Sequence, residues 1–299
     1  MLKLDGVCKS YGSREVLRNL TLTAYPREVY GLLGPNGAGK TTTINLICNL
    51  LERDRGRIEF NQQPISAATK SLIGIAPQQN LLYQSLSCQE NLNFYAQLYG
   101  LNKQHRKEQI AWCLDAVQLR DRARSIVANL SGGMQRRLNI AVALVHNPEL
   151  VILDEPTTGL DIETRYEIWS LINKLRETGI TIILTTHLLD EAEKLCQRLG
   201  LLKSGQIIAE GTLETLKKSI PAEEIVMIKT QEKEKAIQRG QELGLTPRRY
   251  GNDLAFWLPQ AQDLKTIMDK FTGIPLDSLS RESIRLEHIY LEMMQQSSI

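Results

Sequence analysis

The segment Gly34-Pro35-Asn36-Gly37-Ala38-Gly39-Lys40-Thr41 lies between a short apolar run, Val29–Leu33, and a segment with helical spacing of its apolar residues, Thr41–Leu51. Glycines allow a backbone to turn so that successive N–H groups point into one concavity, and the first turn of the following helix adds the positive end of its dipole. The pattern GxxxxGK[ST] between a strand and a helix therefore predicts a loop that binds phosphate groups. The alternative is a simple glycine turn before a helix.

Two side chains of this loop are expected to act directly on a nucleoside triphosphate. Lys40 would reach the β- and γ-phosphates, and the hydroxyl of Thr41 would be a ligand of Mg²⁺. The expected contacts to the nucleotide come from consecutive residues, namely Gly34, Pro35, Asn36, Gly37, Ala38, Gly39, Lys40, Thr41 and Thr42.

A second candidate feature is a pair of acidic residues, Asp154-Glu155, that ends the apolar run Leu150–Leu153. Two carboxylates at the end of a strand buried on both faces are costly unless a cation lies beside them. A magnesium nucleotide on the phosphate-binding loop would supply that cation. We expect Asp154 to order the Mg²⁺ shell and Glu155 to act as the general base on the attacking water. The alternative is a solvated strand end before the turn at Pro156.

His187 directly follows another β-branched run, Thr181–Thr186. Ligands of open α/β sheets bind at the carboxyl edge of the strands, so this histidine is expected to contact the γ-phosphate. The alternative is an ordinary surface histidine. Asp161, which precedes the helical segment Ile162–Leu175, has the position of a helix N-cap.

The order of the segments predicts the fold class. Buried strands alternate with helices through the middle of the chain, which indicates an α/β fold with a parallel sheet covered on both faces. The N-terminal segments Leu2–Cys8 and Val16–Ala24 are expected to be further strands. From about residue 87 to 127 there are no strand signals, and Ser87 to Glu90 forms a capping box, so a helical insertion is expected.

The C-terminal part has a different order of elements. Residues 1–219 are expected to form the first domain, with Thr212–Ser219 as a short helical linker. Residues 220–299 are expected to form a small α+β domain whose βαββαβ order indicates a ferredoxin-like fold. A last helix is expected at about Ile284–Met294.

Composition limits the classes of function. The chain has 299 residues, 42% of them hydrophobic and 23% charged, which is typical of a soluble globular protein. Its net charge is +2, so no nucleic-acid partner is expected from bulk charge. Five dispersed cysteines show no metal-ligand spacing and indicate reduced thiols. No apolar run approaches the roughly 18 residues of a spanning helix, and Asp5 lies where a secretory signal needs an apolar core. We expect a cytoplasmic chain that reaches a membrane only through a partner.

The segment Leu130-Ser131-Gly132-Gly133-Met134-Gln135 narrows the prediction further. A serine cap and two glycines open a second helix N-terminus that suits a phosphate group. This segment resembles the LSGGQ signature of ABC ATPases, with Met134 ahead of the glutamine, and the chain is similar to that family from Met1 to about Gly211. The resemblance implies a P-loop ATP-binding cassette with a parallel sheet core, an antiparallel β subdomain and a helical insertion, which uses ATP and Mg²⁺. It also implies that Ser131, Gly132, Gly133 and Gln135 bind the ATP of a second cassette in a dimer.

The resemblance assigns further roles. Tyr11 would stack on adenine, with a packing tyrosine as the alternative. Gln78, in Ala76-Pro77-Gln78, would contact Mg²⁺ and link it to the helical insertion. Asp161 matches the D-loop aspartate and His187 matches the switch histidine. The insertion would dock on a membrane permease at the cytoplasmic face of the membrane.

Two segments point to a branch of the family. The residues Gly132 to Leu138 and the tail Leu286 to Leu291 resemble the drug-export and ABC-2 exporter branch, which implies an exporter ATPase. An importer ATPase with a regulatory C-terminal domain is an alternative. A soluble ABC-type ATPase acting on nucleic acid or ribosomes is disfavoured by the single uninterrupted cassette. A non-catalytic scaffold is disfavoured because Lys40, Asp154, Glu155 and His187 are all present.

Overall fold

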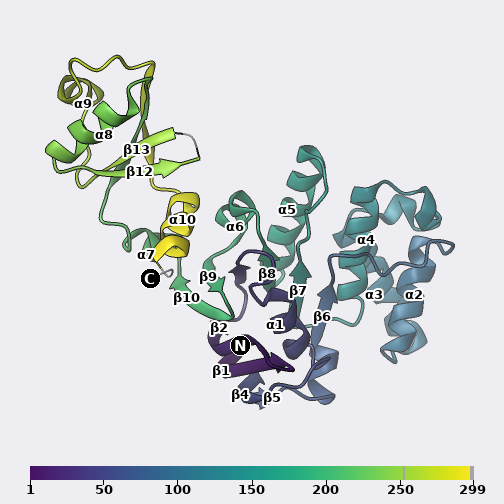
Figure 1. Cartoon of the computed structure of the whole chain (residues 1–299). Coiled ribbons are helices and arrows are strands. Elements are labelled where there is room, and N and C mark those ends of the chain that lie inside the picture. The colour runs from purple at the N-terminus through teal and green to yellow at the C-terminus, as the bar shows by residue number, and fades with distance from the viewer. Residues whose placement is uncertain (252, 297–299) are drawn as a thin grey trace. The chain divides into compact units, whose positions relative to one another are not determined.

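The computed structural model describes residues 1–251 and 253–296 (Figure 1). The chain separates into two compact units, Met1–Leu213 and Glu214–Ile299. The observed division lies at the start of the short helix α7 (Leu213–Lys217), whereas the expected boundary at residue 219 lies just after the end of this helix.

A six-stranded sheet forms the centre of the first unit. Its strands β9, β3, β8, β7 and β6 run parallel, and β10 pairs antiparallel with β9 at one edge. In order across the sheet the strands are β10 (Gln206–Gly211), β9 (Arg198–Lys203), β3 (Val29–Leu33), β8 (Thr181–Thr186), β7 (Leu150–Asp154) and β6 (Ile73–Ala76). The parallel core expected from the buried apolar runs is therefore present, and β6 is a strand that the sequence pattern did not predict.

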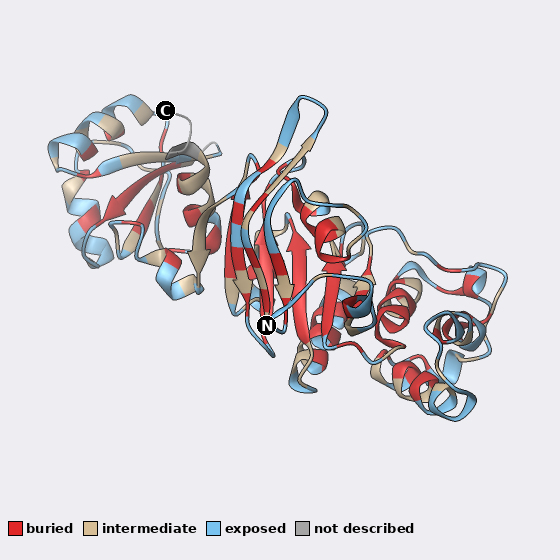
Figure 2. Ribbon diagram, turned by 90° about the horizontal axis from the view of Figure 1, so that it is seen from below, coloured by how far each residue is buried: buried red, intermediate tan, exposed pale blue. Residues whose placement is uncertain are grey.

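The two faces of this sheet belong to different apolar cores, because successive side chains of a strand point to opposite faces. Val151 and Leu153 of β7 pack in one core with residues of the helices α4 and α5. Leu150 and Ile152 pack in the other core with the N-terminal strands and α1. Figure 2 shows the central strands as buried along their length. The helices of this unit outside the insertion are α1 (Lys40–Ile47), α4 (Gly132–Leu144), α5 (Ile162–Glu177) and α6 (Leu189–Leu195).

The N-terminal strands form a second, antiparallel sheet in the order β2-β1-β4-β5. Its strands are β1 (Leu2–Tyr11), β2 (Arg14–Ala24), β4 (Arg55–Phe60) and β5 (Gln63–Pro64). Alternating residues of β1, among them Leu2 and Leu4, are fully buried against the central sheet, which explains the alternation in the sequence.

Two helices form the insertion, α2 (Cys88–Leu98) and α3 (Lys103–Ala116) (Figure 1). The expected capping box is confirmed: the Ser87 hydroxyl accepts from the Glu90 amide at 3.2 Å, and the Glu90 carboxylate accepts from the Ser87 amide at 2.8 Å. Asn102 caps α3 by accepting from the His105 amide. The short 3-10 helices η2 (Arg120–Arg122) and η3 (Val127–Asn129) follow α3 in the chain, and η1 (Ala68–Leu72) precedes β6.

The second unit has a four-stranded antiparallel sheet in the order β12-β13-β11-β14. Its elements follow one another as β11 (Glu224–Lys229), α8 (Lys233–Glu242), β12 (Thr246–Tyr250), β13 (Asp253–Leu258), α9 (Leu264–Lys270), β14 (Ser278–Ser283) and α10 (Leu286–Gln296). The βαββαβ order with the first strand paired between the third and fourth is the arrangement of a ferredoxin-like fold. Phe256 and Phe271 lie in its apolar core. Over residues 1–251 and 253–296, the structure contains no helix with the length and apolar character needed to span a membrane.

Candidate functional site

The glycine-rich loop connects β3 to α1 at the carboxyl edge of the central sheet. Gly37 and Gly39 have φ values of +80° and +113°, which favour glycine, and a Cβ on Gly39 would lie 2.6 Å from Leu17 Cδ2. Lys40 is the first residue of α1, and its ammonium donates across the loop to the carbonyls of Gly34 at 2.7 Å and Pro35 at 3.3 Å. Burial lowers the pKa of Lys40, and the nearby carboxylates of the acid pair oppose that shift.

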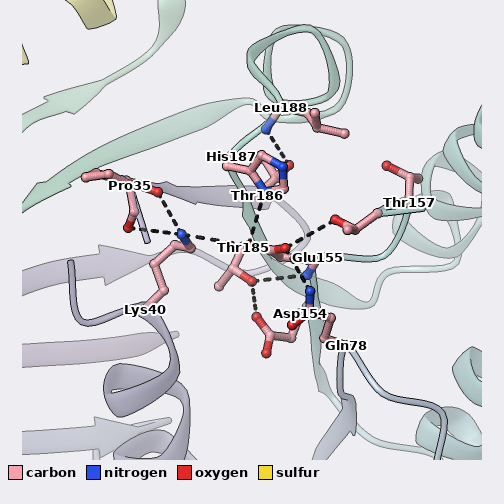
Figure 3. Close-up of polar contacts among 12 residues, drawn as sticks. Pro35, Lys40, Gln78, Asp154, Glu155, Thr157, Thr185, Thr186, His187 and Leu188 are labelled. Carbon is pink, nitrogen blue, oxygen red and sulfur yellow. Dashed lines mark hydrogen bonds and ion pairs between the residues drawn. The ribbon is translucent and has the colours of Figure 1, made fainter. Parts of the chain in front are cut away.

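The acid pair lies at the end of β7, next to β8. Glu155 has a φ of +47°, which is unusual for a residue with a side chain. Its amide donates to the carbonyl of Thr185 at 3.0 Å and to the Thr185 hydroxyl at 3.2 Å. The same hydroxyl donates to the Asp154 carboxylate (Figure 3). Thr185 thus holds both acidic residues at the sheet edge.

The Glu155 carboxylate is the point where separate segments of the chain meet. Its Oε1 lies 3.2 Å from His187 Nδ1 and 3.8 Å from Lys40 Nζ. Its Oε2 accepts from the Gln78 amide and from the Thr158 hydroxyl, both at 3.2 Å. Figure 3 shows Lys40, Gln78 and His187 around Glu155; they come from the start of α1, the segment after β6 and the end of β8.

A cavity of about 680 Å³ opens over these groups. Its lining includes the expected residues Tyr11, Pro35, Asn36, Gly37, Gly39, Lys40, Thr41, Thr42, Gln78, Asp154, Glu155 and His187. The structure therefore brings together in one hollow most of the residues that the sequence predicts for one site. Gly34 and Ala38 belong to the same loop without lining the hollow.

The segment Ser131 to Gln135 does not line this cavity within the described part of the chain. Ser131 is exposed and caps α4, because its hydroxyl accepts from the Met134 amide at 3.2 Å. The Gln135 amide donates to the carbonyls of Val127 at 3.2 Å and Leu130 at 3.3 Å. Gly132 is exposed and Gly133 is buried.

Asp161 also lies outside the cavity lining. It caps α5 by accepting from the Thr164 amide at 2.9 Å and from the Thr164 hydroxyl at 2.8 Å. These two hydrogen bonds lower the pKa of the Asp161 carboxyl. Asp161 is therefore the N-cap of α5, as its position in the sequence predicts.

The donor groups in the cavity fit a magnesium ion. Thr41, Gln78 and Asp154 offer a hydroxyl, an amide and a carboxylate, and Mg²⁺ prefers oxygen ligands. Among the described residues no cluster of three or more His, Cys, Asp and Glu side chains could hold a metal alone.

Sequence patterns did not identify several residues of the site. Thr185 and Thr158 bond to the acid pair, and Arg14 and Val16 line the cavity beside Tyr11. The available signal for Thr185 was the change from the apolar residues Ile182 to Leu184 to two threonines at the end of the strand Thr181–Thr186.

A parallel sheet with a glycine-rich phosphate loop and an acid pair at its carboxyl edge defines the class of P-loop nucleotide-binding proteins. Comparisons with known proteins narrow the class. The profile of the ABC transporter family matches residues 17–158. The chain is 40% identical over 231 residues to the linearmycin resistance ATP-binding protein LnrL of Bacillus subtilis (strain 168), covering 76% of this chain and 74% of that protein. It is 41% identical over 218 residues to a Nod factor export ATP-binding protein I of Rhizobium sp. (strain N33), covering 72% of each.

Solved structures that resemble this chain are also ATP-binding cassettes of ABC transporters. An ATP-binding subunit of an ABC transporter is 31% identical, with a TM-score of 0.66 over 73% of this chain and 92% of that one. A dimeric cassette in a post-hydrolysis state with ADP and Pi is 29% identical, with a TM-score of 0.63 over 71% of this chain and 98% of that one. The chain belongs to the ABC transporter family, as an ATP-binding subunit with ATPase activity.

Proposed function

We propose that this subunit hydrolyses Mg²⁺–ATP at a dimer interface and thereby powers export through a separate membrane permease. The observation that carries the proposal is the convergence of Lys40, Gln78, Asp154 and His187 around the Glu155 carboxylate in one cavity. Each of these residues has a side chain suited to one part of phosphoryl transfer.

In this proposal Glu155 accepts the proton of the attacking water. The ammonium of Lys40 neutralises charge on the β- and γ-phosphate oxygens, and the imidazole of His187, 3.2 Å from Glu155, contacts the γ-phosphate. Thr41, Gln78 and Asp154 would hold Mg²⁺, which would supply positive charge that offsets the charge of the phosphates.

The signature segment (Ser131–Gln135) acts on the nucleotide of the second subunit. Its serine and first glycine are exposed at the start of α4, and none of its residues lines the cavity of their own chain. An exposed helix N-terminus attracts phosphate, so a second cassette facing it would complete each site. Tyr11 stacks on the adenine and Asp161 lies at the subunit boundary.

The test of the site is steady-state ATP hydrolysis by the purified protein. We expect turnover that requires Mg²⁺, that is abolished by EDTA and restored by added Mg²⁺. Lys40→Ala should abolish it, because no other cavity residue places an ammonium against the loop. Lys203→Ala, a change of the same kind at a lysine outside the cavity lining, is the control. Undiminished turnover in Lys40→Ala would refute the site assignment.

Two observations support the proposed coupling to an export permease: the names of the relatives support export, and the surface of the insertion supports docking. The relatives include ATP-binding proteins named for linearmycin resistance and for Nod factor export. Exposed apolar side chains gather around the insertion: Tyr83 and Phe94 are 47% and 40% exposed, and their rings meet edge to face at 4.8 Å. Leu98, also on α2, is 72% exposed. Such apolar surface is typical of a protein–protein contact.

The docking part of the proposal is tested by co-purification with a polytopic membrane protein from the native host. Phe94→Ala and Leu98→Ala together, or charge reversals across Arg106 to Glu108, should reduce recruitment to the membrane fraction. Leu50→Ala, which removes a 67% exposed apolar side chain outside the insertion, is the matched control. Intact recruitment of every insertion variant would place the permease contact elsewhere. The cytoplasmic face of the membrane is the location that this docking requires.

A further inference from the structure

Arg136 is a buried charge that no role in the proposed site accounts for. It lies in the second turn of α4, directly after the signature segment, and only 4% of it is exposed. Its guanidinium donates to six oxygen acceptors. They are the carbonyls of Pro156 at 2.8 Å, Asp154 at 2.8 Å, Glu155 at 3.0 Å, Pro77 at 2.6 Å and Gln78 at 3.1 Å, and Asn80 Oδ1 at 3.4 Å.

These acceptors belong to two segments that are distant in the sequence. Nε and Nη2 donate to three successive peptide carbonyls at the end of β7 and just after it, from Asp154 to Pro156. Nη1 bonds to the segment after β6, from Pro77 to Asn80. The planar fork of an arginine presents donors in fixed directions, so it fixes the distance between the two segments. Burial lowers the pKa of Arg136, and the charges of Asp154, Glu191 and Glu155 oppose that shift.

The two segments carry the side chains that meet at the catalytic point. Gln78 Nε2 donates to Glu155 Oε2 at 3.2 Å, while the backbone carbonyls of the same two residues accept from Arg136. Glu155 also has the left-handed φ of +47°, and such a conformation persists only when the surroundings hold it. Thr185 holds the amide of this residue and Arg136 holds its carbonyl.

Neighbours on α4 show that the contact is specific to one face of the helix. Asn139, three residues further along, donates to the Pro77 carbonyl at 3.2 Å and accepts from the Leu81 amide at 3.4 Å. Arg137, which follows Arg136 in the chain, instead points towards α5, and its Nη2 lies 3.8 Å from Glu167 Oε2. The face of α4 that carries Arg136 is thus the one that meets the segment with Gln78.

We propose that Arg136 is a positioning residue for ATP hydrolysis: it sets the Glu155 carboxylate against the Gln78 amide and ties both to the helix that begins with the signature segment. A change at the signature end of α4 would then reach the general base through a single side chain. The inference rests on the proposed role of Glu155 as the base.

The first test is Arg136→Lys, which keeps the charge but has three donors on one nitrogen and no planar fork. We expect kcat to fall by about 100-fold, the effect of a misplacement of about 1 Å in a catalytic group, while ATP affinity stays close to wild type. Arg136→Gln, which removes the charge, should show the same loss confined to kcat. Arg120→Lys, at a side chain that is 71% exposed in the insertion, is the matched control.

The second test asks whether Arg136 acts through Glu155. In a Glu155→Gln background, single-turnover hydrolysis should be nearly unaffected by Arg136→Lys, because the base that it positions is already absent. An equal fold-loss in both backgrounds, or a loss of ATP affinity that matches the loss of kcat, overturns the proposal. Failure of both Arg136 variants to fold would assign the residue to stability alone and also overturn it. If Glu155→Gln by itself leaves turnover unchanged, the proposed function fails instead, whatever Arg136 does.

Discussion

Mixing two inactive variants tests whether the site is shared between two subunits. The cavity takes Lys40 from its own chain, while Ser131 is exposed and outside the cavity lining. Lys40→Ala and Ser131→Arg should each be nearly inactive alone, because each homodimer carries the same lesion in both sites. In a heterodimer of the two variants, one site carries both lesions and the other carries none, since the dimer is symmetric.

The expected recovery follows from counting. Random association of equal amounts gives about half heterodimers, each with one intact site of two, so activity should return to about a quarter of wild type. Both variants should remain folded. Loss of the Ser131 cap on α4 costs about 1 kcal/mol, which is small against a typical stability of about 5–15 kcal/mol.

The assay measures ATP turnover of each variant alone and of heterodimers isolated with two different affinity tags. Far-UV circular dichroism and melting curves check that both variants are folded. If Ser131 served the ATP of its own chain, each site of the heterodimer would carry one lesion and no ratio would restore activity. Isolated heterodimers no more active than the two parent variants would therefore favour a site formed within one chain, or an obligate need for two working sites.

Three further predictions concern the base, the stability at low pH and the packing of the sheet. Glu155→Gln should bind ATP with nearly unchanged affinity, but its turnover should be lower by about 10²–10⁴-fold because the base is lost. It should accumulate as an ATP-dependent dimer in size-exclusion chromatography. A monomer at saturating ATP would contradict the paired mechanism. Burial lowers the pKa of His146 in the folded chain to about 4. Below about pH 6.5 the unfolded chain therefore binds a proton that the folded chain does not. The free energy of unfolding should fall by up to about 3 kcal/mol as the pH falls towards 4. His146→Phe, which keeps an aromatic ring against Tyr99, should remove that loss in urea unfolding measured at pH 6.5 and 4.5, and parallel pH curves for the two proteins would contradict the assignment. Gly74→Ala should destabilise the first unit by about 1–3 kcal/mol in the same assay, because its Cβ would lie 2.0 Å from the carbonyl of Ala143; an unchanged midpoint would show that α4 moves away freely.

The sequence alone determined the local features of this protein. The loop from Gly34 to Thr41, the strand that ends in Asp154-Glu155 and the capping box at Ser87 each depend on residues close together in the chain, so spacing and residue type were enough to predict them. The parallel core followed because apolar runs alternate with helices. Element boundaries shifted slightly: the last helix, expected at about Ile284–Met294, is α10 at Leu286–Gln296.

The tertiary structure decided which distant residues meet. β6 has only four residues, Ile73 to Ala76, one of them a glycine, and its pairing with β7 is what brings Gln78 to Glu155. Thr185 and Arg136 were not predicted as site residues, because their role lies in bonds to backbone groups and side chains far away in the sequence. A residue pattern records which side chain is present, whereas the set of acceptors that surround a buried guanidinium exists only after the sheet and α4 have packed together.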